Sequence, residues 1–569
     1  MKDLFLNIGV WMKPRLLPIF ILMGSALFFA ATINPVRPAH TDSIVFATVA
    51  RDMVQSGDWI VPRFNGQPDF WKPPLQYWLI ALAYRSFGIS PVSAVLPSLG
   101  LAVLGVWIVY HLGTIFWNQR GGAISALVLA TNLHYYEASR MAMMDLGLSV
   151  LILLALGCWV RSVFLQDDRW RIVIGFYGSM ALAVLMKGPQ GAVIPLGIVG
   201  LYSLWAGILS PVLQGKRALF GTILFLLIAL PWYIGMALQF GERYIQHFFF
   251  QENVQRILGA NVTLWDRLIK FPQSFFEAFA PFGLWNLLLW PAIGLGVREL
   301  FRAKSGDRRA GFLTLWVLSL FLGFSFTWAN AARYFQPFIP GASLLVGGIA
   351  HLIPWEGRPW RWGGAAAIAL SVFFVCAVAG AALGIWPMVE VPDTTAVWFI
   401  LGWVLFFLVT AGWILRFQRW HWVPIQWGFF TGWAILFCFG WLPSRIALNP
   451  VADLARHLQE VHLSDLPIGV TGYDAQKELI YFVDVHPRVV TGLSETLDFL
   501  ARHPRACLIA SRSEYDRFPE EARRTLKIQA VAKGWPVIRM RLLNEPDPIR
   551  AAFRKVEWLL LVQDRSASS

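Results

Sequence analysis

The sequence predicts a polytopic α-helical membrane protein of about thirteen transmembrane helices, followed by a small C-terminal α/β domain. Of its 569 residues, 57% are hydrophobic and only 14% are charged, and the mean hydropathy is +0.54. A soluble chain could not bury this much apolar surface. The apolar residues also gather in segments of about 20 residues, the length that crosses a bilayer. Lys and Arg lie between alternate segments, as the positive-inside rule requires.

Thirteen apolar segments have spanning length. A further apolar stretch, Leu75 to Gly88, is too short to span, so we interpret it as an interfacial or re-entrant helix. The first segment follows Lys2, Lys13 and Arg15 and lacks a small-residue cleavage motif, so we expect a retained anchor. The segments lie near residues 16–33, 92–116, 121–138, 146–164, 171–186, 189–209, 217–238, 275–298, 310–328, 335–353, 363–387, 395–416 and 424–443.

Basic residues orient these segments. With the N-terminus inside, every inward loop carries Lys or Arg, including Arg120, Arg161, Lys216, Arg298 and Arg358. Residues 1–443 then form the membrane domain, and 444–569 lie outside. The outward loops are residues 34–91, 139–145, 187–188, 239–274, 329–334 and 388–394.

Composition also limits the function classes. The net charge of +14 fits cytoplasmic loops that face anionic lipid, so we expect no nucleic-acid partner. The four cysteines form no C-x-x-C pair, which indicates neither a zinc site nor a disulfide framework.

Residues 444–569 read as a soluble α/β domain. Short apolar runs predict strands at LPIGVTGY, RACLIAS and VIRMRLL, and amphipathic runs predict helices at KELIYFVD and ETLDFLARH. GVTGYDA does not match the G-x-G-x-x-G fingerprint, so a soluble nucleotide-sugar site is not indicated.

The first outward loop carries several motifs in a fixed order. Asp42 is followed by A-R-D-M (50–53), G-D-W-I-V-P (57–62) and K-P-P-L-Q-Y-W (72–78). This order resembles the first periplasmic loop of the type-C glycosyltransferases. Within that class it is most similar to the bacterial aminoarabinose transferases and the relatives of protein O-mannosyltransferases.

The resemblance implies a multi-pass enzyme of the bacterial inner membrane with a periplasmic active site. Such an enzyme moves a monosaccharide from a polyprenyl-phosphate donor, such as an undecaprenyl phosphate sugar, to lipid A, lipopolysaccharide or another envelope glycan. One-step displacement would invert the anomeric centre. We expect a monomer whose partners are the bilayer, the lipid-linked donor and the acceptor. Three alternatives stay open: protein O-mannosyltransferase-like protein glycosylation, a lipid-linked sugar flippase, and a non-catalytic assembly protein.

Two aspartates are the candidate catalytic residues. The family's aspartate at the position of Asp42 is the presumed catalytic one, and a carboxylate there could accept a proton from an acceptor hydroxyl. A helix N-cap is the plainer interpretation of Asp42. Asp145 ends the motif S-R-M-A-M-M-D, which begins at Ser139-Arg140 and matches the end of the family's second outward loop. A charge between apolar segments is costly unless it is paired or functional, and an interfacial helix cap is again the plainer interpretation.

Cations on the same side are candidate ligands of the donor phosphate: Lys72, Lys187, Arg256 and Arg333. Lysines that extend toward the interface without a functional role are the alternative. F-F-F-Q-E-N-V-Q-R (248–256) resembles a family element that contains Arg256 and Glu252. Further candidate substrate contacts are Arg140, Glu252, Tyr77, Trp78 and Tyr334.

Three departures from the family pattern concern metal binding and substrate identity. Trp71 stands where aminoarabinose transferases place Glu before the lysine, and Asn253 stands where they often have His. Asp42 is followed by Ser-Ile-Val-Phe instead of Glu-x-Arg-Tyr. The missing acid and imidazole weaken the expectation of a divalent metal, which the sequence leaves open, and the sugar stays unidentified.

Overall fold

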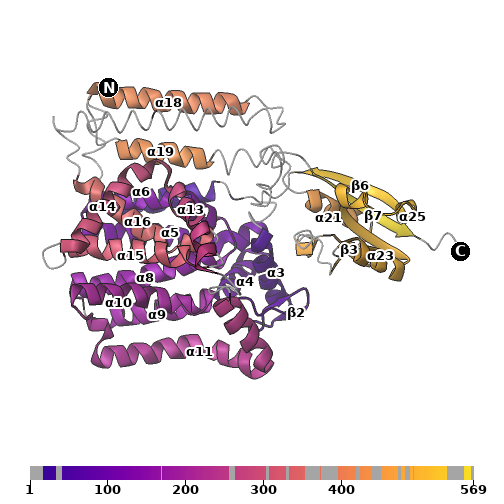
Figure 1. Cartoon of the computed structure of the whole chain (residues 1–569), viewed down its shortest axis with the longest axis horizontal. Coiled ribbons are helices and arrows are strands. Elements are labelled where there is room, and N and C mark those ends of the chain that lie inside the picture. The colour runs from indigo at the N-terminus through magenta and orange to yellow at the C-terminus, as the bar shows by residue number, and fades with distance from the viewer. Residues whose placement is uncertain are drawn as a thin grey trace.

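The computed structural model is a bundle of long helices with a separate α/β domain at one end (Figure 1). It describes residues 17–31, 33, 41–167, 169–255, 263–302, 307–327, 332–352, 372, 395–417, 423–436, 450–471, 476–477, 479–480, 487–490, 492–534 and 556–564. The predicted span at 363–387 therefore lies almost wholly outside the described residues.

The membrane part consists of apolar helices that pack on one another around a shared core. By length and composition, five helical stretches within the described residues can cross a membrane: Pro91–Phe116, Met144–Phe164, Trp170–Lys187, Gly215–Gln255 and Trp265–Arg302. The helices are α2 (Leu17–Ala30), α5 (Pro91–Phe116), α6 (Gln119–Ala130), α7 (Leu133–Ser139), α8 (Met144–Phe164), α9 (Trp170–Lys187), α10 (Gln190–Ala206), α11 (Gly215–Ile245), α13 (Leu264–Phe279), α14 (Asn286–Arg302), α15 (Arg308–Ser325), α16 (Phe338–Leu352), α18 (Thr395–Phe417) and α19 (Val423–Leu436).

Two predicted spans are interrupted helices. The segment 121–138 divides into α6 and α7, because the Asn132 side chain accepts a hydrogen bond from Tyr135 N and starts a new helix. The segment 275–298 begins earlier in the chain, as α13. A 3-10 turn, η3 (Ala280–Trp285), then leads into α14, and Gly283 has a φ of +53° there, which favours glycine.

The predicted outward loop 239–274 is largely helical. α11 continues to Ile245, and a π-helix, η2 (Gln246–Gln255), follows it directly. π-helical turns are uncommon and often occur at functional sites. α13 then begins at a capping box formed by Thr263 and Asp266.

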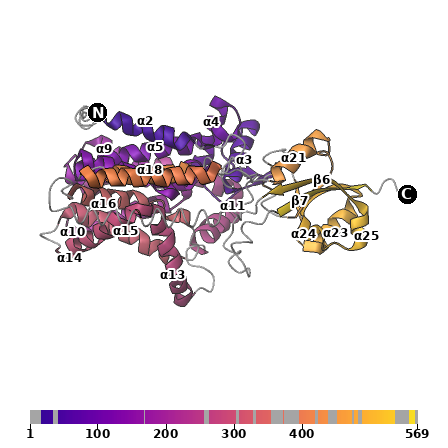
Figure 2. The same ribbon diagram turned by 90° about the horizontal axis from the view of Figure 1, so that it is seen from above.

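The first outward segment folds into two helices and a hairpin. α3 (Thr41–Ser56) leads to the strands β1 (Arg63–Phe64) and β2 (Gln67–Pro68), and α4 (Leu75–Phe87) follows. Asn65 and Gly66 have φ of +53° and +73°, as a tight two-residue hairpin turn requires. In both ribbon views α3 and α4 lie at the end of the bundle that faces the α/β domain (Figures 1 and 2).

Buried and partly buried tryptophans join the helices. The indole N–H of Trp117 donates to Leu344 O, that of Trp316 to Pro337 O and that of Trp285 to Thr131 Oγ1, each at 2.9 Å. The N–H of a buried indole usually finds an acceptor, and here these bonds tie one helix to another. The tryptophan content therefore serves packing inside the bundle as well as its surface.

The α/β domain contains a mixed five-stranded sheet in the order β4-β3-β5-β7-β6. β3 pairs with β4 and β5 in parallel, and β7 pairs antiparallel with β5 and β6. α21 packs against one face through a core that includes Leu454 and Ile509, and α23 packs against the other through Phe499 and Leu508. The elements are α21 (Pro450–Glu460), β3 (Ile468–Val470), β4 (Arg488–Val489), α23 (Gly492–Arg502), β5 (Arg505–Ser511), α24 (Arg512–Tyr515), α25 (Glu520–Thr525), β6 (Leu526–Gly534) and β7 (Val556–Asp564).

Candidate functional site

The turn G-D-W-I-V-P (57–62) gives the first outward segment a fixed shape. Asp58 Oδ1 accepts hydrogen bonds from the backbone N–H of Ile60 and of Val61, both at 3.1 Å. The indole of Trp78 donates to Trp59 O at 2.6 Å, and that of Trp232, on α11, donates to Ile60 O at 2.8 Å. These bonds hold the segment between α4 and α11.

Asp42 lies in the first turn of α3 and is shared by two cations. Arg333 NH1 donates to Oδ2 at 2.9 Å, and Lys477 Nζ donates to Oδ1 at 3.0 Å. Arg333 comes from the short helix η4 (Ala332–Phe335), and Lys477 comes from the C-terminal domain. The Asp42 side chain is 34% exposed, so solvent and ligands can still reach it.

This arrangement keeps Asp42 ionised. Partial burial raises the pKa of its carboxyl, but the hydrogen bonds and charges of Arg333 and Lys477 outweigh that effect and lower the pKa to about 2. A carboxylate held this way is well positioned but is a weak base, because base strength falls with pKa.

Asp145 and Lys187 form a buried pair. Asp145 lies in the first turn of α8, and its Oδ1 accepts from Lys187 Nζ at 2.5 Å. Lys187 ends α9, and its ammonium also lies 4.4 Å from the centre of the Tyr334 ring, a cation–π contact. Because Tyr334 follows Arg333, this contact places the Asp145 pair beside the Asp42 cluster.

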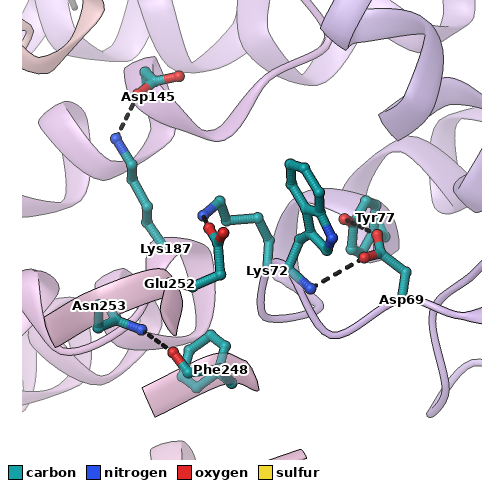
Figure 3. Close-up of polar contacts among 9 residues, drawn as sticks. Asp69, Lys72, Tyr77, Asp145, Lys187, Phe248, Glu252 and Asn253 are labelled. Carbon is teal, nitrogen blue, oxygen red and sulfur yellow. Dashed lines mark hydrogen bonds and ion pairs between the residues drawn. The ribbon is translucent and has the colours of Figure 1, made fainter. Parts of the chain in front are cut away.

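A second lysine pair lies nearby (Figure 3). Lys72 Nζ donates to Glu252 Oε2 at 2.8 Å and joins the first outward segment to η2. The side-chain amide of Asn253 donates to Phe248 O at 2.7 Å, which closes the π-helical turn. Figure 3 shows the Lys72–Glu252 and Lys187–Asp145 pairs on the same side of η2.

A cavity of about 280 Å³ lies between the two aspartate clusters. Its walls include His134, Glu137, Asp145, Arg333 and Gln336. Three buried atoms in these walls, Asp145 Oδ2, His134 Nε2 and Gln336 Oε1, have no hydrogen-bond partner among the described residues. Buried polar atoms are rarely left without partners, so this pattern favours a site for a polar ligand.

Other predicted residues have different surroundings. The Tyr77 hydroxyl donates to Asp69 Oδ2 at 3.3 Å and its ring stacks on Phe46, and Trp78 bonds Trp59, so both support the first outward segment. Arg140 is buried next to α7. Arg256 lies outside the described residues.

A second hollow lies against the β1–β2 hairpin. Its volume is about 390 Å³, and its walls include Asp69, Trp71, Arg243 and His247. Burial raises the pKa of the Asp69 carboxyl, although Trp71 N and Tyr77 donate to it. This hollow contains none of the candidate catalytic residues.

The described residues do not assemble a metal centre. They contain no group of three or more His, Cys, Asp or Glu side chains close enough to share an ion. At the two positions where the family pattern has Glu and His, Trp71 offers no ligand atom and the Asn253 amide already donates to a backbone oxygen.

The sequence did not identify Lys477, His134, Glu137 or Gln336 as site residues. His134 and Glu137 lie just before the predicted outward loop 139–145, and Gln336 follows the predicted cation Arg333 by three residues, so proximity to those motifs was a usable signal. No local signal marks Lys477, which lies in a predicted soluble helix 435 residues after Asp42.

Comparison with known proteins supports the motif resemblance. Residues 71–234 match the model of the dolichyl-phosphate-mannose-protein mannosyltransferase family. An uncharacterized protein of Aquifex aeolicus (strain VF5) is 31% identical over 44% of this chain and 60% of its own. The undecaprenyl phosphate-alpha-4-amino-4-deoxy-L-arabinose arabinosyl transferase of Yersinia pestis (strain Pestoides F) is 27% identical over 57% of this chain and 58% of its own. The chain thus spans about 60% of the length of these relatives.

A solved structure matches nearly the whole fold. The crystal structure of ArnT from Cupriavidus metallidurans bound to undecaprenyl phosphate superposes with a TM-score of 0.67 at 18% identity, over 95% of this chain and 97% of that chain. The chain therefore has the fold of this ArnT structure. The resemblance to the aminoarabinose and protein O-mannosyl transferases is confirmed. In this fold, Asp42 and Asp145 lie at the first turns of two different helices; Asp145 lines the cavity, and so does Arg333, the partner of Asp42.

Proposed function

We propose that this protein is a membrane glycosyltransferase that moves a monosaccharide from a polyprenyl-phosphate donor to an acceptor of the cell envelope. The observation that carries the proposal is the pairing of candidate carboxylates with lysine and arginine around one cavity. Asp42 is paired with Arg333, and Asp145 with Lys187. The similarity to undecaprenyl-phosphate sugar transferases supports the same reaction class.

The cations suit a phosphate leaving group. A donor phosphodiester leaves as a phosphate monoester, and preorganised cations stabilise the charge that develops on its oxygens. Arg333 lines the cavity, Lys187 lies against the ring of the next residue, Tyr334, and Lys72 pairs with Glu252 of η2. No general acid is needed once cations hold the phosphate.

The cavity between the aspartates suits the donor sugar. Its volume of about 280 Å³ lies near the lower end for ligand pockets, which start at about 300 Å³, so it fits a small ligand such as one monosaccharide. The atoms Asp145 Oδ2, His134 Nε2 and Gln336 Oε1 in its walls could bond sugar hydroxyls or an amine.

The transfer is a single displacement. An acceptor oxygen attacks C1 of the sugar, the bond from C1 to the phosphate oxygen breaks, and polyprenyl phosphate leaves. For a hydroxyl acceptor, the Asp42 carboxylate takes the hydroxyl proton. For a phosphate acceptor there is little proton to remove, and Asp42 positions the nucleophile. Either course inverts the anomeric centre.

The proposed acceptor class, and the side of the membrane on which transfer takes place, rest on the predicted topology of the spans. The predicted spans place α3, the start of α8 and the C-terminal domain on the outer face of a bacterial inner membrane. Lipid A, lipopolysaccharide or another envelope glycan is the acceptor class that this position favours.

A membrane transfer assay tests the proposal. Wild type, Asp42→Asn and Asp145→Asn are supplied with radiolabelled polyprenyl-phosphate sugars, and the label is followed into lipid, glycan and protein fractions. We expect transfer by wild type and a loss of at least a hundredfold in Asp42→Asn, the scale of general-base catalysis. The labelled fraction identifies the acceptor class.

Glu299→Gln is the matched control, because Glu299 lies near the end of α14 and pairs with Arg302, away from the site. Full activity in both aspartate variants would contradict the proposed site. Movement of intact donor across the membrane without sugar transfer would favour a flippase instead.

A further inference from the structure

The C-terminal domain reaches into the candidate site at α3. Lys477 donates to Asp42 at 3.0 Å, and only 8% of its side chain is exposed. Two turns further along α3, both terminal nitrogens of the buried Arg51 donate to Ile480 O at 3.3 Å. Gln476 is fixed within its own domain by a bond from its amide to Pro487 O. Lys477 and Ile480 are thus bonded to α3, and Gln476 is bonded to its own domain.

Lys477 changes the charge balance of the site. Lys187 balances Asp145, and Lys72 balances Glu252. Asp42 carries one negative charge, but its partners Arg333 and Lys477 carry two positive charges.

Arg333 already occupies one oxygen of Asp42, so Lys477 is the second cation that the described residues bring to this carboxylate.

We propose that Lys477 is an anion-binding residue of the transfer site, supplied by the C-terminal domain, and that a substrate phosphate replaces Asp42 as its partner. This inference rests on the proposed function and adds a residue and a domain to it. The ligand chemistry is a phosphate monoester or diester, which belongs either to the lipid-linked donor or to a phosphorylated acceptor.

The exchange of partners connects binding with catalysis. In the structure both oxygens of Asp42 accept from cations, which keeps the carboxylate oriented but weakly basic. When a phosphate draws Lys477 away, Asp42 loses one of its two cations. It then becomes a stronger base at the moment when the leaving group is bound. Asp42 thus accepts the hydrogen bond from Lys477 that a substrate phosphate is proposed to accept in its place.

Binding of undecaprenyl phosphate to the purified full-length protein tests whether the phosphate that Lys477 binds is that of the lipid-linked donor. We expect Lys477→Met to weaken binding about tenfold, since a charge-assisted hydrogen bond contributes about 1.5–3 kcal/mol and 1.4 kcal/mol is a factor of ten. Lys477→Arg keeps most of the affinity. Lys527→Met is the matched control, because Lys527 is an exposed lysine of β6 in the same domain.

Asp42→Asn provides the sharper test. Removing the competing carboxylate should tighten undecaprenyl phosphate binding several-fold even though transfer is lost. The double variant with Lys477→Met should lose that gain, because the two side chains act on one another directly. A lysine that only supports the fold would not produce this opposite pair of effects.

Uncharged undecaprenol is the probe that reports an intact membrane domain, and its binding should be equal in all variants. If Lys477→Met leaves undecaprenyl phosphate binding unchanged but raises the KM of lipid A and not that of dephosphorylated lipid A, the phosphate is the acceptor's. Unchanged binding together with unchanged KM for both substrates overturns the inference. Because ligand binding needs no turnover, a wild type that binds but transfers nothing would contradict the proposed function alone.

Discussion

Asp42 accepts hydrogen bonds from residues 291 and 435 positions further along the chain. The sequence placed Asp42, Asp145, Lys187 and Arg333 on one side of the membrane by charge counting alone. It could not tell which cation meets which carboxylate, because that depends on helix packing and not on local pattern. Lys477 was out of reach for the same reason.

The shifted pKa of Asp42 gives a pH dependence of stability. Its folded pKa of about 2 lies below the ordinary value of 3.8. The stabilisation from ionised Asp42 is therefore complete above about pH 4 and is lost as the pH falls toward 2. We expect Asp42→Asn to lower the free energy of unfolding by about 1 kcal/mol at pH 7, the scale of partly exposed ion pairs.

Thermal unfolding of the two detergent-solubilised proteins between pH 7 and 2 measures this difference. The gap in Tm should be constant down to about pH 4 and then close. A gap in Tm that stays constant down to pH 2 would show that Asp42 has an ordinary pKa in the folded protein.

Glu137 tests whether the cavity takes the sugar. Its carboxylate lies 3.4 Å from His134 Nδ1 in the cavity wall. If Glu137 bonds the sugar, Glu137→Gln should raise the KM of the lipid-linked donor about tenfold, the scale of a hydrogen bond to a charged group. Binding of undecaprenyl phosphate, which has no sugar, should stay unchanged. If Glu137→Gln weakens the binding of the donor and of undecaprenyl phosphate equally, Glu137 acts at the phosphate and not at the sugar.

At the scale of elements, helix ends carry the site. Asp42 and Asp145 lie in the first turns of α3 and α8, and Lys187 is the last residue of α9. These ends were predictable, because each follows a boundary between an apolar segment and an outward loop. The π-helical turn η2 and the breaks at Asn132 and Gly283 were not, because their apolar pattern continues across the irregularity.

Gly188 holds the end of α9 in a conformation that favours glycine. Its φ is +109°, and an added Cβ would lie 3.3 Å from Phe248 Cζ and 3.4 Å from Asn253 Oδ1. Gly188→Ala should therefore displace Lys187 and raise the donor KM, with a loss of stability of about 1–3 kcal/mol from backbone strain.

Gly207→Ala is the control for this variant. Gly207 also ends a helix, α10, with a φ of +65°, but nothing lies within 4 Å of its added Cβ. It should lower Tm without changing the donor KM. An unchanged donor KM in Gly188→Ala would show that the end of α9 does not position Lys187 for the donor.

At the scale of the whole molecule, the site lies where two domains meet. Sequence patterning predicted the strand at 505–511 and the helix at 495–503, which are β5 and the core of α23, and it missed β6 and β7. It gave no indication of how the domain sits on the membrane part. That placement depends on single long-range contacts such as the bonds from Arg51 to Ile480 O.

Arg51 tests this junction. Arg51→Met removes both hydrogen bonds to the 476–480 segment without touching Lys477. We expect a weaker affinity for undecaprenyl phosphate, roughly threefold to tenfold, because Lys477 is less well positioned. Arg63→Met is the control, since Arg63 lies on the hairpin of the same outward segment and pairs with Asp58. If Arg51→Met and Arg63→Met bind undecaprenyl phosphate with equal affinity, this junction does not position Lys477.

The partnership between Asp42 and Lys477 also sets an order of events during biosynthesis. Asp42 is among the first residues to leave the ribosome, and its second cation is made 435 residues later, after the membrane helices. A nascent chain that has already inserted its helices thus still lacks part of the charge at α3. On the proposed role of Lys477, the charge at α3 would be complete only when the C-terminal domain has folded against it, so that chains lacking this domain would bind the lipid-linked donor less tightly.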